Sequence, residues 1–281
     1  FEYFSGYGFN KSHAVSYSII SYQCAWLCNY YNVEWVASFL DKEPETRKEK
    51  AINLAKQHGY TIQPLNVNKS HRSWEILDEQ TLVAPLTTIK GMGDKAIDQI
   101  LAHRPFNTIE EFLFNENIVY SKLNKKALDA LCRAGAMTDL IDDRFTGDKH
   151  FWTATCVDRP RKLKNLAENI EKYRPEGNFS DDERIDFLAN LTGIFPMNLV
   201  LDESIQRKLD QHCVPPISEF DPELGMCWCI VREVTKKKTK NGKLFYVANV
   251  IDNNSVETKV RCWTVNPDRD ILYVNRPYMI K

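Results

Sequence analysis

The chain has 281 residues, a formal net charge of −1 at pH 7 and 43% hydrophobic residues. This length accommodates two or three domains, each with its own hydrophobic core. The balanced charge excludes nucleic-acid binding through bulk charge, so any such binding must come from local basic patches. No run of about 18 apolar residues occurs, which argues against a membrane span.

Eight cysteines are present, mostly at apolar positions of predicted helices or strands. Because they form no disulfide-like framework, we expect a reducing, cytoplasmic environment. Cys227 and Cys229 make a C-x-C pair and Cys213 follows His212, but no second ligand pair has suitable spacing for zinc. We therefore expect no metal site in this chain. The alternation of Cys227, Cys229 and Val231 instead predicts the inner face of a strand.

The opening segment, Gly6 to Gln23, combines glycines, a Lys-Ser-His triplet and tyrosines with an apolar helical stripe. Glycines at 6 and 8 allow a sharp turn or a close approach to a ligand. Polar residues at 10–13 then supply donors and positive charge where a helix begins, which suits phosphate groups. Apolar residues recur at helical spacing from about Ala14 to Tyr30. The alternative is a buried helix whose polar start only caps it.

The elements that follow are mainly helical, and their ends carry clear signals. We predict helices at 45–58, 94–103, 108–115, 124–134, 162–173 and 181–191. Thr108 and Glu111 match a capping box. Short strands are expected at 74–77 and 81–84, and longer ones at 226–235, 243–251 and 256–263, with a fourth beginning near 278. Asn241-Gly242 predicts a type I′ hairpin turn.

Two loops carry candidate DNA-binding residues. The first is an apolar-x-G-x-G turn before a helix, in which backbone N–H groups can meet a DNA phosphate; its residues are Lys90, Gly91, Met92, Gly93 and Lys95. The second is a lysine-rich hairpin followed by Phe245 and Tyr246, a combination that binds single strands; its residues are Lys236, Lys237, Lys238, Lys240 and Lys243. The alternatives are a plain glycine turn and a solvated loop.

Several motifs resemble one family in the same order along the chain. FSGYGFNKSHAVSYSIISYQCAWL, followed by NVEWVASFL, resembles the end of the fingers domain of bacterial C-family replicative DNA polymerases, the DNA polymerase III alpha subunits. QPLNVNKS, IKGMGDKAIDQILAHRPF and LNKKALDALCRAGAMTDL resemble later parts of that family, including its helix-hairpin-helix. GMCWCIVREVTKKKTKNGKLFYVANVID resembles its OB domain more loosely.

The resemblance implies a multi-domain, mainly α chain with a small β part. It divides the chain into an end of the fingers domain (1–62), a tandem helix-hairpin-helix domain (63–141), a helical connector (142–215) and a partial OB-fold β-barrel (216–281). The OB-fold has five strands, so we expect an incomplete barrel. The start in mid-motif without a Met suggests a C-terminal fragment or one piece of a split protein.

The resemblance also assigns roles in the opening segment. Lys11 and Ser12 would lie near the triphosphate of an incoming dNTP, and His13 near its sugar, where it screens out a 2′-hydroxyl. Tyr7 and Tyr17 would shape the pocket. The nucleotide-binding candidates are Tyr7, Asn10, Lys11, Ser12, His13 and Tyr17. For His13 the alternative is a histidine that caps its own helix.

Nucleotidyl transfer needs carboxylates that hold two metal ions. In the family these belong to the palm, and no palm motif occurs in this sequence. We therefore expect Mg²⁺ to be bound by a palm-containing portion or partner chain, and this chain alone to be inactive on primer-template DNA. A sliding-clamp contact is doubtful, since residues 142–215 lack a clamp-binding peptide. The competing interpretations are a non-enzymatic DNA-binding accessory protein and a scaffold.

Overall fold

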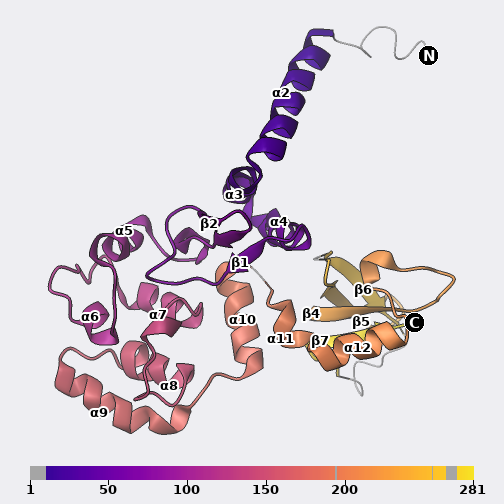
Figure 1. The fold of residues 1–281 in the computed structure, drawn as a ribbon. Coiled ribbons are helices and arrows are strands. Elements are labelled where there is room, and N and C mark those ends of the chain that lie inside the picture. The colour runs from indigo at the N-terminus through magenta and orange to yellow at the C-terminus, as the bar shows by residue number, and fades with distance from the viewer. Residues whose placement is uncertain (1–10, 194, 255, 264–270) are drawn as a thin grey trace.

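The computed structural model describes residues 11–193, 195–254, 256–263 and 271–281. Helix α2 (Lys11–Tyr30) projects from the body of the molecule, and α3 (Asn32–Lys42) and α4 (Glu45–Gln57) join it to that body (Figure 1). None of the residues of α2 is buried. Within the described chain its apolar side chains meet no core, so this chain by itself does not bury the helix.

A small sheet follows α4. It contains β1 (Thr61–Gln63), β2 (Glu75–Asp78) and β3 (Thr81–Val83) in the order β1-β3-β2. Strand β3 pairs parallel to β1 and antiparallel to β2. The two strands predicted at 74–77 and 81–84 are confirmed, whereas β1 was expected only as an extended segment.

The next helices form the largest core. They are α5 (Asp94–His103), α6 (Ile109–Leu113) and α7 (Lys125–Arg133). Thr108 caps α6 by accepting from the Glu111 N–H, but the Glu111 carboxylate accepts from the N–H of Asn107. Only half of the predicted capping box forms, because the carboxylate reaches one residue further back. The same hydrophobic core includes residues from Val33 to Ile170 and therefore crosses the boundaries predicted near residues 62 and 141. The domain boundaries stay predictions.

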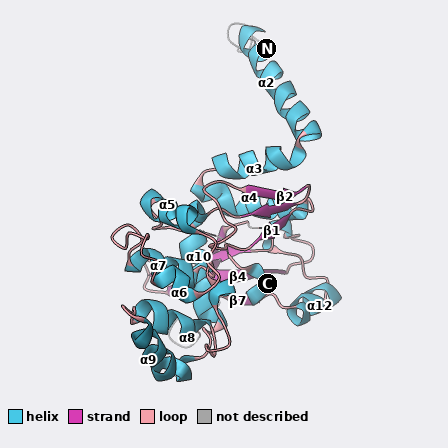
Figure 2. Ribbon diagram, turned by 60° about the vertical axis from the view of Figure 1, so that its left-hand side comes forward, coloured by secondary structure: helices cyan, strands magenta, loops and turns pink. Residues whose placement is uncertain are grey.

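The connector is helical, as expected. It contains α8 (Asp148–Trp152), a π-helical turn (Thr153–Val157), α9 (Leu163–Tyr173), α10 (Asp181–Thr192), α11 (Met197–Val200) and α12 (Glu203–Gln211). Short 3-10 turns occur at Leu86–Thr88, Thr138–Leu140, Arg174–Glu176 and Ile217–Glu219. Figure 2 shows α6 to α9 on the far side of the first sheet from α2, with α5 beside that sheet. A full capping box forms at the start of α10, between Ser180 and Glu183.

A second, antiparallel sheet contains β4 (Cys227–Lys238), β5 (Leu244–Ile251), β6 (Thr258–Cys262) and β7 (Arg276–Ile280) in the order β6-β5-β4-β7. Cys229 and Val231 pack in its core, as the strand prediction required. Burial raises the pKa of the Cys229 thiol to about 12. The mainly α fold with a small β part is confirmed, and the OB assignment stays a prediction.

The turn between β4 and β5 differs from the predicted type I′. Gly242 has a positive φ of +85°, but Asn241 does not, although a type I′ turn needs both. The Thr239 carbonyl accepts from the Gly242 N–H (3.0 Å), and the Thr239 N–H donates to Lys243 (2.9 Å). This pattern is a three-residue loop built on a type I turn, with glycine in the left-handed position.

A joint at Phe195 connects three parts of the chain. The Phe195 N–H donates to Glu49 Oε1 of α4 (3.2 Å), and the Arg232 guanidinium of β4 lies 4.2 Å from the centroid of the Phe195 ring. Asn275 and Arg276 of the second sheet contact Asp186 and Asp182 of α10. Helix α10 therefore lies between the helical core and the second sheet (Figure 1).

Replacing Glu49 with Gln tests the burial of a carboxylate in this joint. Desolvation raises the pKa of Glu49 above 4.5, against the opposing attraction of Arg232. The protonated form is therefore favoured on folding, so this group's contribution to stability is greatest below the unfolded pKa and is lost as pH rises through the folded pKa. We expect Glu49→Gln to match the wild type at acid pH and to be the more stable at neutral pH in urea unfolding. Glu203→Gln, at a carboxylate whose side chain is 88% exposed, should follow the wild type throughout.

Candidate nucleic-acid interface

The glycine turn before α5 presents an exposed backbone. Gly91 has a φ of +88°, which favours glycine, and both Gly91 and Gly93 are exposed. The N–H of Lys90 donates to Leu191 (2.7 Å) and that of Met92 to Ile89 (3.1 Å). Among the described residues no backbone acceptor takes the N–H of Gly91 or Gly93. These two groups are placed for an external acceptor such as a phosphate oxygen.

Two carboxylates beside this turn share one arginine, which offsets one of their two negative charges. Arg72 Nη1 lies 2.8 Å from Asp94 Oδ1, and Nη2 contacts Asp98 Oδ1. Hydrogen bonds to Asp98 and Asp94 raise the pKa of Arg72. The start of α5 is thus less repulsive to a phosphate than its sequence suggests, because two acidic side chains there share a cation.

Lys126 was missed by the sequence reasoning. A Cβ built on Gly91 would lie 3.4 Å from Lys126 Cε, so this lysine of α7 lies against the glycine turn. The predicted Lys90 instead extends toward the end of α10, where its Nζ would lie 3.8 Å from a Cβ on Gly193. Only the distance in space between the glycine turn and the start of α7 could have indicated Lys126. That distance is set by the tertiary structure and cannot be read from the sequence.

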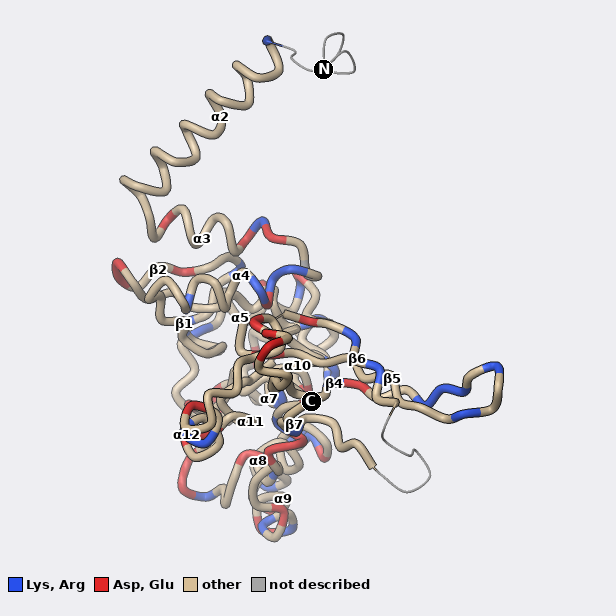
Figure 3. The backbone as a smooth tube through the Cα atoms, turned by 90° about the vertical axis from the view of Figure 1, so that its right-hand side faces the viewer, with Lys and Arg blue, Asp and Glu red and all other residues tan. Residues whose placement is uncertain are grey.

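The lysine-rich hairpin forms a projecting positive tip (Figure 3). At its base Phe245 stacks on Trp263, with ring centroids 4.1 Å apart and planes inclined by 20°. The register pairs Lys237 with Phe245 and Val247 with Arg261. Since side chains alternate along a strand, Lys237, Arg261 and the aromatic pair share one face.

Tyr246 lies on the opposite face, the side of the core residues Ala248 and Val250. Of the two aromatic residues that the sequence placed beyond the lysine hairpin, only Phe245 lies on the face with Trp263. The sequence reasoning missed Trp263 because it comes just after β6, 18 positions from Phe245. Stacked, half-exposed aromatic rings beside cations are suited to unpaired bases.

The nucleotide-binding candidates are only partly described. Tyr7 and Asn10 lie outside the described residues, whereas Lys11, Ser12, His13 and Tyr17 occupy the first turns of α2. His13 and Tyr17 are in ring contact, with centroids 4.4 Å apart. The structure brings these four residues together on one exposed helix end, and their nucleotide role stays a prediction.

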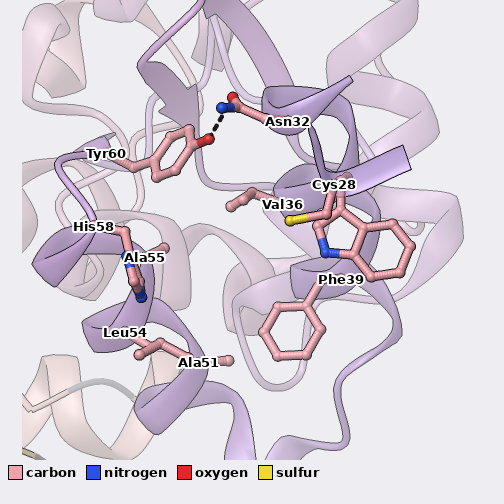
Figure 4. Close-up of a pocket in the computed structure, with 10 residues that line it drawn as sticks. Cys28, Asn32, Val36, Phe39, Ala51, Leu54, Ala55, His58 and Tyr60 are labelled. Atoms are coloured by element: carbon pink, nitrogen blue, oxygen red, sulfur yellow. Dashed lines mark hydrogen bonds between the residues drawn. The ribbon is translucent and has the colours of Figure 1, made fainter. Parts of the chain in front are cut away.

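An apolar groove of about 490 Å³ lies between α3 and α4 (Figure 4). Tyr60 donates to Asn32 Oδ1 (2.7 Å) at its rim. Its lining residues are Cys28, Asn32, Trp35, Val36, Phe39, Ala51, Leu54, Ala55, His58 and Tyr60. Because Cys28 belongs to α2, the groove is continuous with the exposed apolar side chains of that helix.

Within the described ranges, no group of three or more His, Cys, Asp or Glu side chains could hold a metal ion. No helix there is long and apolar enough to cross a membrane.

Residues 59–146 match the family described as "Helix-hairpin-helix motif". The glycine turn, α5, α6 and α7 all fall inside this match. The middle of the chain is thus a helix-hairpin-helix module.

Longer matches are found to proteins named "DNA polymerase III subunit alpha". That of Thermus aquaticus is 36% identical over 262 residues, covering 86% of this chain and 21% of the relative. That of Aquifex aeolicus is 28% identical over 263 residues, covering 91% and 22%, and that of Vibrio cholerae is 33% identical over 224, covering 73% and 19%. The chain is homologous to a part of the DNA polymerase III alpha subunits, which confirms the family resemblance. It spans about a fifth of the length of these relatives.

Replacing Trp263 with Ala should weaken binding of single-stranded DNA. Stacking of one base on an aromatic side chain is worth about 1–3 kcal/mol, so we expect a loss of at least about fivefold in fluorescence-anisotropy titrations of an oligothymidylate. Phe220→Ala removes another half-exposed aromatic ring outside the strands and serves as the control. Equal affinities for wild type and Trp263→Ala would show that this face does not stack bases.

Proposed function

We propose that this chain is part of a replicative DNA-directed DNA polymerase that binds primer-template DNA, with the catalytic carboxylates in a palm-bearing portion elsewhere. The main support is the similarity to DNA polymerase III alpha subunits over as much as 91% of the chain. The helix-hairpin-helix match, with its exposed glycine turn, supports duplex binding.

The proposed division of labour follows from the chemistry. The palm portion would hold Mg²⁺, which activates the primer hydroxyl and stabilises the leaving group. Lys11 and Ser12 would approach the triphosphate of the dNTP, and His13 its sugar. Tyr17, in contact with His13, would hold that ring in place. Such an enzyme acts in the bacterial cytoplasm, where the eight unpaired thiols stay reduced.

The apolar surface of α2 supports a missing partner portion. Large apolar side chains of this helix are at least 41% exposed, among them Val15, Tyr17, Ile20, Tyr22, Trp26 and Leu27. A soluble protein rarely exposes a continuous patch of this kind. We propose that the palm-bearing portion covers this helix and the α3–α4 groove, which would bring the start of α2 to the nucleotide. A sliding clamp stays a doubtful partner.

Primer extension tests the assignment. We expect no extension by the chain alone, and Mg²⁺-dependent extension when the palm-bearing portion is present in the same polypeptide or added as a second one. Robust synthesis by the isolated chain would place catalysis within it and overturn the proposal.

Replacing His13 with Ala in the complete enzyme tests the sugar contact. Removing a side chain that excludes one hydroxyl changes discrimination by about tenfold or more. We therefore expect ribonucleotide incorporation to rise by that factor, while His103→Ala, at a ring bonded to the Gln99 carbonyl, leaves it unchanged. Unaltered discrimination in His13→Ala would favour the helix-capping alternative.

The second candidate is a non-enzymatic DNA-binding accessory protein. The helix-hairpin-helix module and the basic hairpin support it equally well. It has no use for a nucleotide-facing segment, so the His13 experiment separates the two.

A further inference from the structure

Two lysines occupy an electrostatically unfavourable position at the start of α7. Lys125 and Lys126 are the first two residues of this helix, immediately after the Asn124 cap. A helix N-terminus carries partial positive charge, so cations there are destabilising and acidic residues are favoured. Lys125 is partly compensated, because its Nζ donates to the Val157 carbonyl (2.7 Å). For Lys126 no hydrogen bond or ion pair occurs within the described residues.

The position of the Lys126 side chain indicates why a cation without a partner in the described chain stands at the start of α7. Its side chain passes the exposed glycine turn, since a Cβ on Gly91 would lie 3.4 Å from Lys126 Cε. The N–H groups of Gly91 and Gly93 have no backbone acceptor in the described chain. The cation of Lys126 therefore lies beside Gly91, whose N–H has no backbone acceptor there, and the N–H of Gly93 follows two residues on in the same exposed turn. This set is complementary to a phosphate.

We propose that Lys126, rather than Lys90, supplies the cation that binds a backbone phosphate of duplex DNA at the Gly91–Gly93 turn. This rests on the proposed function and assigns a residue that the sequence pattern did not indicate. Lys126 comes from the start of α7, so the glycine turn and the start of α7 together make one phosphate site.

Lys90 has a different role. Its N–H donates to the Leu191 carbonyl, and its ammonium lies near Gly193, the left-handed C-terminal cap of α10. Cations are favoured at a helix C-terminus. Lys90 thus anchors the glycine turn to α10 and holds it in place for Lys126 and the phosphate.

The acidic groups nearby do not compete for Lys126. Asp94 and Asp98 are bound by Arg72, and Asp129 of α7 is bound by Arg133 and by the indole N–H of Trp152. Duplex DNA is favoured over an acidic protein because the site offers backbone donors and a single cation. Backbone donors and one cation can bind any phosphate along a DNA backbone, and such contacts carry no information on base sequence.

The test uses binding of a blunt DNA duplex of arbitrary sequence to the full chain at several salt concentrations. Each phosphate neutralised contributes about 0.9 to the slope of log K against log salt. We expect Lys126→Gln to lower the slope by about 0.9 and the affinity by about eightfold near 0.1 M salt. Lys126→Arg should restore both. Lys90→Gln should leave the slope unchanged and lower the thermal midpoint.

Lys164→Gln is the matched control, since this lysine is 85% exposed on α9, and it should bind like the wild type. Glycine-selective ¹⁵N labelling gives a second readout, because addition of duplex should shift the amides of Gly91 and Gly93 among the 11 glycines. A slope that falls in Lys90→Gln and not in Lys126→Gln, with wild-type binding intact, overturns the lysine assignment alone. Absence of any duplex binding by the wild type overturns the proposed function of this module.

Discussion

The spatial relation between the hairpin module and the second sheet depends on a short segment at the end of α10. The Leu191 carbonyl accepts from the Lys90 N–H, the Phe195 N–H donates to Glu49, and the Phe195 ring lies under Arg232. Leu191 and Phe195 thus connect the glycine turn, α4 and β4, the longest strand. Any displacement of this segment would move both candidate DNA surfaces relative to α2.

The joint combines charge with burial. Transferring a carboxylate out of water is costly unless it is hydrogen-bonded and paired, and Glu49 has the Phe195 N–H and the field of Arg232. Arg232 stacks on Phe195, yet its Nη1 is buried without a hydrogen-bond partner in the described chain. A buried carboxylate and guanidinium of this kind add less to the free energy of unfolding than apolar side chains of equal size would. Their directional bonds instead fix one arrangement of α4 and β4.

Local patterns predicted the elements because their signals are local. Thr108, Asn124 and Ser180 each accept a hydrogen bond at a helix start that the sequence indicated. Long-range relations were not predicted. A bulge at Arg232 shifts the register between β4 and β5, and the Phe245–Trp263 stack depends on the pairing of β6. Lys126 reaches Gly91 only because the tertiary fold brings the start of α7 to the glycine turn, which no spacing in the sequence encodes.

The near-neutral net charge of the chain is compatible with DNA binding at local basic sites. Acidic side chains near the glycine turn are held by Arg72, whereas Lys126 stays exposed beside that turn. In the proposed function the turn contacts backbone phosphates and the sheet face stacks on bases, and neither contact reads a sequence. The proposed polymerase, which would have to copy every sequence, needs this indifference. A strongly basic chain would also bind DNA far from a primer end, whereas two modest sites connected through the Phe195 joint favour DNA that reaches both.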